Sequence, residues 1–477
     1  MELNFCSGAY ETFSKNLNAQ ECTNFFTHVD SEGGVSKLSL RGTPGLKEWY
    51  DTGHYAEVRG VHEFGNSVYA VVGNRVYRVY SDTTAITCTK VPDAVTGVGD
   101  VETLDTSDGP VSMADNGVQL MIVDGMSGYI IEGIISTKIT DGSFPANPET
   151  VTYQDSYFIV SIHDSNYCYI SDTADGTAWD STQNIAAGGY SDNVIAIISD
   201  NKNLYLMGNK TIESFYNSGG DPAFTYRPGS IQSVGIGARH SVANLDNTLF
   251  FLTDKYQVAR YEGNNPIAKS TRSVEYQIAQ YEKKSDAIGM GIMIEGNSFY
   301  VLTFPTANET WCFNVATGFW NKLTSYPYEQ RWRGNCHAYF KDKSIVGDYK
   351  NGKLYEWDFD TYKDNSEDIR RIRVASAVKQ DGKRVFHNQL ELFFESGIGL
   401  ISGQGSDPMA MLQYSDDGGH TWSSETWRSA GKIGKYGWRA IWNRLGASRQ
   451  RYYKLTVNDP VKWVVTGANL EVQVGTT

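Results

Sequence analysis

The sequence contains little proline, little cysteine and no long apolar run. There are 12 Pro and 6 Cys among 477 residues, and the cysteines are scattered with no CxxC pair. Scattered thiols favour reduced cysteines in a protein made in a cytoplasm over a disulfide-held secreted domain. The longest apolar stretches, such as Val194–Ile198, are far shorter than the ~20 residues that cross a bilayer. Residues 1–10 also lack a secretion signal, so we expect no membrane insertion.

Motifs of common enzymes and cofactor sites are also missing. The chain has no GxxxxGK[ST] phosphate loop, no GxSxG nucleophile elbow and no HExxH pair. The eight histidines are far apart, and His54 and His62 have no thiolate or carboxylate at ligand spacing. Gly235-Ile-Gly237 lacks the third glycine of a dinucleotide site. These absences predict no cofactor and no metal, whereas pairing among the many acidic residues stays open from the sequence alone.

Aromatic residues and glycine, by contrast, are abundant. The chain holds 30 Tyr, 20 Phe, 11 Trp and 47 Gly. Strands favour aromatic and β-branched side chains, and glycine supplies turns that need a positive φ. No capping box is followed by a long run of 3.6-residue period, so helices should be few. This composition predicts an all-β fold.

Between about residues 61 and 362 the sequence repeats two alternating apolar runs joined by Gly, Asn or Asp turns. Blades of four strands typically take about 40–50 residues, and this repeat averages about 46. Radial packing of blades buries both faces of each sheet and shortens the exposed edges. The pattern predicts a β-propeller of six or seven blades over residues 60–365, with a stack of β-sandwiches as the alternative. One apolar residue taken from the first run of each unit marks the repeat: Tyr69, Leu120, Phe158, Tyr205, Phe251, Tyr300 and Ile345.

Both ends of the chain depart from this period. Residues 1–59 are polar and contain the turn Gly42–Gly45. We expect an irregular N-terminal arm there, which either covers a neighbour or supplies the strand that closes the ring. Residues 366–477 contain clean alternations such as Leu390–Phe394 and Tyr452–Val457. These alternations predict a separate C-terminal antiparallel β-sandwich.

The formal net charge of −13 is unevenly distributed. Residues 366–477 carry 15 Lys and Arg against 11 Asp and Glu, whereas residues 1–365 carry 27 against 44. An acidic body repels nucleic acid. The sequence therefore predicts no sequence-specific DNA binding, and its basic C-terminal region fits an acidic partner.

One sharp motif lies in the C-terminal region. Residues 415–422, SDDGGHTW, match the SxDxGxTW pattern of an Asp-box. In this pattern the aspartate accepts backbone N–H groups across a turn and the tryptophan packs beneath it. Asp-boxes recur in sialidases and related glycan hydrolases, but a single box outside the repeat, with no Arg-Ile-Pro element, favours a purely structural turn. The residues of this turn are Ser415, Asp417, Gly419, Thr421 and Trp422.

Residues 428–462 combine nine cations and one acid with interleaved Tyr and Trp. Such residues bind nucleic acid through phosphate contacts and stacking, and they also dominate protein interfaces. A solvated sandwich face over core tryptophans is a third interpretation. The acidic remainder of the chain makes nucleic acid the weakest of the three. The candidate protein interface comprises Arg428, Lys432, Lys435, Arg439, Arg444, Arg449, Arg451 and Lys454.

Several segments resemble the packaged-DNA-stabilisation proteins, also called tail hubs or tail accessory factors, of short-tailed phages (podoviruses). The clearest are Lys210–Gly219, with the strand TIESFY, and the following Arg227–Ala238, with the segment QSVGIGA. The similarity extends over most of the chain, although this sequence differs in having a complete Asp-box. Weaker resemblance lies in Asn24–Phe26, Thr43–Gly45, Asn244–Tyr261, Tyr414–Gly419, Trp438–Arg439 and Arg449–Leu455.

The resemblance implies a virion protein of the tail that is not an enzyme and has no catalytic residues. Members of this family form a homohexameric ring below the portal and its adaptor ring. They close or extend the DNA exit channel, stabilise packaged DNA until genome ejection, and anchor the tail needle and the tailspikes or fibres. The accompanying hypothesis is that acidic side chains line the channel and that the basic sandwich contacts an acidic neighbour. A glycan-binding or sialidase-like propeller, or an intracellular scaffold for peptides, remains the alternative.

Overall fold

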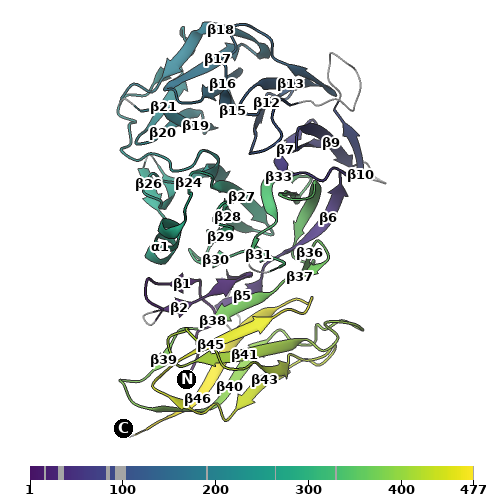
Figure 1. Cartoon of the computed structure of the whole chain (residues 1–477), viewed down its shortest axis with the longest axis vertical. Coiled ribbons are helices and arrows are strands. Elements are labelled where there is room, and N and C mark those ends of the chain that lie inside the picture. The colour runs from purple at the N-terminus through teal and green to yellow at the C-terminus, as the bar shows by residue number, and fades with distance from the viewer. Residues whose placement is uncertain are drawn as a thin grey trace.

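The computed structural model describes residues 1–475 except 16–17, 31–36, 82–85, 92–103, 190–191, 264 and 328–329. Seven sets of four antiparallel strands form a ring, and a two-sheet β-sandwich lies at one end of it (Figure 1). The predicted propeller and C-terminal sandwich are confirmed, and the propeller has seven blades. The first strands of neighbouring blades contact one another around the ring, except between blades 4 and 5, where the short 3-10 turn η1 (Arg239–Ser241) contacts β19 of blade 4 and β27 of blade 6.

Six of the blades are continuous in sequence. Blade 1 contains β7 (Val58–Phe64), β8 (Ser67–Val72), β9 (Arg75–Ser81) and β10 (Ile86–Lys90), and blade 2 contains β11 (Ser112–Asp115), β12 (Gln119–Val123), β13 (Gly128–Glu132) and β14 (Ile135–Lys138). Blade 3 contains β15 (Pro148–Gln154), β16 (Tyr157–Ile162), β17 (Tyr167–Asp172) and β18 (Asp175–Ala186), and blade 4 contains β19 (Val194–Asp200), β20 (Asn203–Gly208), β21 (Ile212–Asn217) and β22 (Phe224–Tyr226). Blade 5 contains β23 (Ala243–Leu245), β24 (Thr248–Leu252), β25 (Val258–Glu262) and β26 (Asn265–Ala268), and blade 6 contains β27 (Ile288–Ile294), β28 (Asn297–Phe304), β29 (Glu309–Asn314) and β30 (Trp320–Lys322).

The second strand of a blade is its most buried one. Every residue of β8 (SVYAVV), β12 (QLMIV) and β24 (TLFFL) is buried, because these strands are covered on both faces by neighbouring blades. Tight hairpins connect such strands; Gly65 and Asn66, with φ of 55° and 61°, join β7 to β8 as a two-residue turn. All seven residues that mark the repeat lie on the second strand of a blade, one strand later than the sequence interpretation placed them.

The seventh blade combines strands from both ends of the propeller sequence. Strands β33 (Gly334–Phe340), β34 (Lys343–Asp348) and β35 (Lys353–Asp358) are followed by β6 (Gly45–Asp51) as the outer strand. Strand β6 pairs antiparallel with β35 over its whole length and parallel with β36 (Lys363–Asp364) at Leu46. The N-terminal segment thus supplies the strand that closes the ring.

The remaining N-terminal residues belong mostly to the sandwich, and the expectation of an irregular arm is wrong for them. Strand β3 (Cys22–Thr23) pairs with β30 of blade 6 and with β38 (Arg371–Val374), and β4 (Phe25–Val29) forms a hairpin with β5 (Leu38–Gly42). Alternation along β4 places Phe25 in the sandwich core and Phe26 in the core shared by blades 6 and 7. The N-terminal segment therefore joins the two domains.

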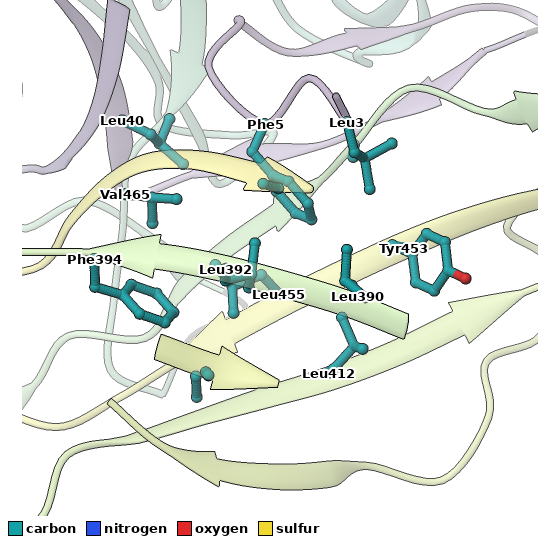
Figure 2. Close-up of a cluster of buried hydrophobic side chains, with 14 of the residues drawn as sticks. Leu3, Phe5, Leu40, Leu390, Leu392, Phe394, Leu412, Tyr453, Leu455 and Val465 are labelled. Carbon is teal, nitrogen blue, oxygen red and sulfur yellow. The ribbon is translucent and has the colours of Figure 1, made fainter. Parts of the chain in front are cut away.

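The sandwich packs two sheets face to face. Leu3, Phe5 and Leu40 from the N-terminus interdigitate with residues of the C-terminal strands in this core (Figure 2). One sheet contains β38, β45 (Gln450–Val457), β41 (Met409–Ser415) and β42 (Thr426–Ser429), with β39 (Val378–Lys379) beside β45; the other contains β4, β5, β46 (Val464–Val474), β40 (Val385–Phe394) and β43 (Arg439–Asn443), with β44 (Ala447–Ser448) beside β40.

Short elements fill the gaps between these sheets. The one α-helix of the described residues, α1 (Arg272–Gln280), begins at the N-cap Thr271 and packs Val274 and Ile278 into the core between blades 5 and 6. The hairpin β1 (Tyr10–Glu11) and β2 (Ala19–Gln20) lies against it. The hairpin β31 (Thr324–Ser325) and β32 (Gln330–Arg331) follows blade 6, and β37 (Glu367–Asp368) pairs with β36.

Buried polar side chains join the N-terminal segment to both domains. The Asn24 side chain donates hydrogen bonds to the carbonyl oxygens of Thr324 (3.0 Å) and Arg370 (2.8 Å). The buried Arg373 guanidinium donates to the carbonyl oxygens of Phe5 and Glu21, at 2.8 and 3.0 Å. Because buried polar groups are costly to leave unpaired, these bonds fix propeller and sandwich as one rigid body.

Candidate interaction surface

The Asp-box forms a closed turn between β41 and β42. The Asp417 carboxylate accepts hydrogen bonds from the backbone N–H groups of His420 (3.0 Å) and Thr421 (2.9 Å) and from the Ser415 hydroxyl (2.7 Å). The Ser415 hydroxyl in turn accepts the N–H of Gly419 at 2.8 Å. The Thr421 hydroxyl also donates to this carboxylate and has the largest effect on it. Together these donors hold the pKa of Asp417 well below its usual range. The carboxylate is therefore ionised and engaged within its own turn.

The box packs inward, against the N-terminal segment. Trp422 lies on a small core formed by Ala19, Val374 and Tyr452. A Cβ on Gly419 would lie 3.1 Å from the Cβ of Ala19, so the turn approaches this segment closely. The Lys454 ammonium group lies 4.3 Å from the centre of the Trp422 ring. The box thus packs the connection between β41 and β42 against strand β2 of the N-terminal segment.

Two loops meet at one end of the sandwich, and we call residues 396–408 and 430–438 the end loops. The N–H of Gly434 donates to the Gly397 carbonyl oxygen (3.1 Å), and the N–H of Trp438 donates to the Ser396 hydroxyl (3.2 Å). The N–H of Ala430 donates to the Pro408 carbonyl oxygen at 2.7 Å. These bonds hold the end loops together as one surface.

The end loops expose apolar side chains. Ile401 is 89% exposed and Tyr436 is 80% exposed. Leu400, Ile433 and Trp438 are exposed as well, and Trp427 on β42 adds to the exposed aromatic residues beside them. Clustered exposed apolar residues of this kind mark interaction sites. Sequence reasoning found the aromatic residues but missed Leu400 and Ile401, whose one signal is an apolar pair inside a Gly- and Ser-rich segment.

Four cations of the sequence-predicted interface lie at this end. Arg428 is exposed on β42, and its Nε donates to the Ile441 carbonyl oxygen at 2.9 Å across the edge of the sandwich. Lys432 lies 3.8 Å from Asp407, and Lys435 lies 5.4 Å from the centre of the Trp438 ring. Arg439, which begins β43, forms an ion pair with Glu391 at 2.5 Å. All four keep their charged groups at the surface.

The other four cations of the candidate interface lie elsewhere. Arg444 and Arg449 are exposed, and Arg449 donates to the Gly382 carbonyl oxygen at 2.8 Å. Lys454 is half-buried over Trp422. For Arg451 the structure contradicts the prediction of an interface residue. Its side chain is 2% exposed and forms a bidentate ion pair with Asp416, at 2.6 and 2.7 Å. Alternation along β45 turns Arg451 inward, so it stabilises the domain and cannot contact a partner.

The described linings of the two cavities near the centre of the propeller hold no facing pair of carboxylates. A cavity of about 570 Å³ lies among the first strands of blades 1, 2, 5, 6 and 7, and its described lining includes Arg59 and Tyr339 but no Asp or Glu. Arg59 donates to the carbonyl oxygens of Gly73 and Thr106, at 3.0 and 2.7 Å. In the adjoining cavity Asp115 lies 2.8 Å from His62. Retaining and inverting glycosidases use two facing carboxylates, and these linings offer one.

The described chain offers neither a metal centre nor a membrane-spanning helix. It contains no group of three or more His, Cys, Asp or Glu side chains arranged to hold a metal ion. In the same residues no helix is long and apolar enough to cross a membrane.

The fold defines a two-domain protein, a seven-bladed β-propeller joined to a β-sandwich that exposes loops at one end. The chain belongs to the Bacteriophage P22 Gp10 family. A family model described as "Bacteriophage P22 Gp10, beta-propeller" matches residues 1–362, and one described as "Bacteriophage P22 Gp10, beta-sandwich" matches residues 370–473. The resemblance to packaged-DNA-stabilisation tail proteins is thereby confirmed, and the protein is a structural component of a phage tail.

Several solved structures match about two thirds of the chain at low sequence identity. "YCF48 bound to D1 peptide" has 12% identity and a TM-score of 0.37, and the match covers 66% of this chain and 97% of that one. BamB from Moraxella catarrhalis has 8% identity and a TM-score of 0.39, with 69% and 94% covered. The Neurospora crassa Pan2 WD40 domain has 9% identity and a TM-score of 0.41, with 67% and 95% covered. No curated protein matches the chain.

Proposed function

We propose that the chain is the tail hub of a short-tailed phage. Six copies form a ring below the portal and its adaptor ring, extend or close the DNA exit channel, and retain the packaged genome until ejection. The ring also anchors the tail needle and the tailspikes or fibres. The observation that carries this proposal is the match of one phage tail family to both domains, residues 1–362 and 370–473.

The physical properties of the chain support this role. A hub must resist the pressure of packaged DNA, and the N-terminal segment, bonded to both domains, removes the flexible linker that two separate domains would have. The net charge of −13 disfavours tight DNA binding. A channel built from such subunits lets DNA slide through it. Loops at several faces of a rigid scaffold give room for several partners.

The proposal is tested with DNA-filled heads that carry portal and adaptor but lack this protein. Adding the purified chain should yield particles with a ring at the portal vertex and should protect the packaged DNA from added nuclease. Heads without the chain should lose their DNA to the nuclease. If the chain leaves DNA loss unchanged and does not co-sediment with the heads, the hub assignment is wrong.

A further inference from the structure

The charge of the molecule is concentrated in two segments of opposite sign. Residues 139–201 contain nine Asp and Glu and no Lys or Arg, and they include all of blade 3. Residues 426–458 contain eight Lys and Arg and no Asp or Glu, and they include the second end loop. Blades 2 and 3 lie at the top of the long axis and the sandwich lies at the bottom (Figure 1). The molecule is therefore electrically polar along its length.

The acidic end presents a continuous surface, which we call the blade face. It is formed by the turns that join first to second and third to fourth strands in blades 2 and 3. The N–H of Ala174 donates to the Ser156 carbonyl oxygen at 2.7 Å within blade 3. The N–H of Gly176 donates to the Gln119 side chain at 2.9 Å, which connects blade 3 to blade 2. These bonds hold the turns of two blades together as one surface.

The blade face carries exposed carboxylates and apolar groups together. Glu132, Asp155 and Asp172 are exposed there, and within the described chain none of them has a Lys or Arg within ion-pair distance. Val118, 64% exposed, and Ile134, 54% exposed, extend from the neighbouring turns of blade 2. The end loops expose Lys432 and Lys435 together with Ile401, Ile433 and Tyr436, and Arg439 follows them at the start of β43. Their one acid, Asp407, lies 3.8 Å from Lys432.

We propose that the end loops of one copy bind the blade face of a second copy. The two surfaces are complementary in charge, and each adds exposed apolar area that association would bury. The blade face belongs to blades 2 and 3 at the top of the long axis and the end loops belong to the sandwich below the propeller, so the same molecule does not bring them together (Figure 1). A contact between two different surfaces of identical chains is heterologous, and it closes into a ring when the rotation between copies permits. This inference rests on the proposed ring and assigns its interface.

A charge-swap experiment tests the assignment. The loop variant is Lys432→Glu with Lys435→Glu, and the blade variant is Glu132→Lys with Asp172→Lys. Both pairs are exposed, so each variant should keep the circular dichroism spectrum and melting temperature of the wild-type chain. A matched control, Lys255→Glu with Lys283→Glu, makes the same charge change at exposed lysines elsewhere on the propeller. Oligomer mass is measured for all proteins against concentration by light scattering.

The loop variant and the blade variant should each raise the concentration for half-assembly at least about tenfold, because each turns two attractive charges at the interface into repulsive ones. The chain carrying all four changes should assemble like the wild type, since both signs are inverted together. Unchanged assembly of the loop variant, or no recovery in the four-change chain, would overturn the interface. A wild-type chain that stays monomeric at its highest soluble concentration would also overturn it. The hub role itself is judged separately, by binding and DNA protection on heads.

Discussion

At the scale of single residues, the fold depends on a few buried polar side chains that join distant segments. Arg373 is fully buried and donates hydrogen bonds to the carbonyl oxygens of Phe5 (2.8 Å), Gly8 (3.0 Å) and Glu21 (3.0 Å). It also contacts the side chains of Ser7 and Gln20. One guanidinium thus satisfies several acceptors of an N-terminal segment that has little regular structure of its own.

Arg373→Met should lower the free energy of unfolding by about 3–5 kcal/mol, because it leaves these buried acceptors without a donor. Arg384→Met, at an exposed position on the same domain, should change it by less than about 0.5 kcal/mol. Urea denaturation followed by tryptophan fluorescence measures both. Equal stabilities for the two variants would contradict the role of Arg373.

A second buried group makes stability depend on pH. Asp364 accepts the Leu46 N–H at 3.2 Å and the Ser325 hydroxyl at 2.8 Å. Burial raises the pKa of Asp364 to about 6, and this outweighs the attraction of the nearby Arg371 and Arg333. The ordinary pKa of an aspartate is about 3.9. Asp364 therefore stays protonated to a higher pH in the folded state than in the unfolded chain.

The contribution of Asp364 is fully present below about pH 4 and is lost as the pH rises through about 6. Asp364→Asn keeps an acceptor for Leu46 and cannot ionise. Between pH 4 and pH 7 the wild type should lose about 2 kcal/mol relative to this variant. Urea denaturation of both proteins across that range measures the difference. Parallel stability curves would show that Asp364 does not titrate as stated.

At the scale of elements, local patterns predicted the blades and could not predict the pairing between distant strands. The seven marker residues from Tyr69 to Ile345 lie on second strands because these are the most strongly apolar strands of each blade. Strand β6 pairs with β35, some 300 residues later in the chain. The break in the period before residue 60 left ring closure as one of two expectations, but no local signal identifies the partner strand. The same holds for Leu3 and Phe5, which look like part of a polar tail and yet complete the sandwich core.

In the candidate site, too, local patterns predicted some features, whereas others depend on contacts between distant residues. The pattern SxDxGxTW predicted a turn, and the bonds of Asp417 follow directly from its residues. The composition of residues 428–454 predicted a basic surface, but not which cations face outward. Arg451 pairs with Asp416 because the alternation of β45 turns it inward. Ile401 belongs to the exposed apolar surface of the end loops because the two loops contact each other in the folded chain, and no local sequence pattern predicts that contact.

Strand β6 offers a test of ring closure. Lys47 is exposed on β6 opposite Glu356 of β35. Lys47→Pro removes an N–H from this strand and should cost about 3 kcal/mol, whereas Lys47→Ala should be nearly neutral. Hydrogen exchange should show lost protection in β35 for the proline variant alone. Equal protection in the two variants would mean that β6 is not needed to close blade 7.

At the scale of the whole molecule, the rigid connection between the two domains fixes where the acidic and the basic surfaces lie. The N-terminal segment connects propeller and sandwich without a free linker, so the acidic blades and the basic end loops keep fixed positions relative to each other. A rigid polar subunit can repeat around an axis with the same contact each time. Because surface charge pairs are screened by salt, assembly of the purified chain should weaken as ionic strength rises. Light scattering at low and high salt measures this, and assembly that strengthens with salt would point to an interface without charge pairs.

The place of the chain in the particle follows from an electron cryomicroscopy map of the intact virion. The map should contain six copies of a seven-bladed propeller joined to a sandwich, in a ring around the DNA path below the portal. Density for the chain anywhere else, for example only at the tips of fibres, or a particle without the chain, would contradict the assignment as a tail hub.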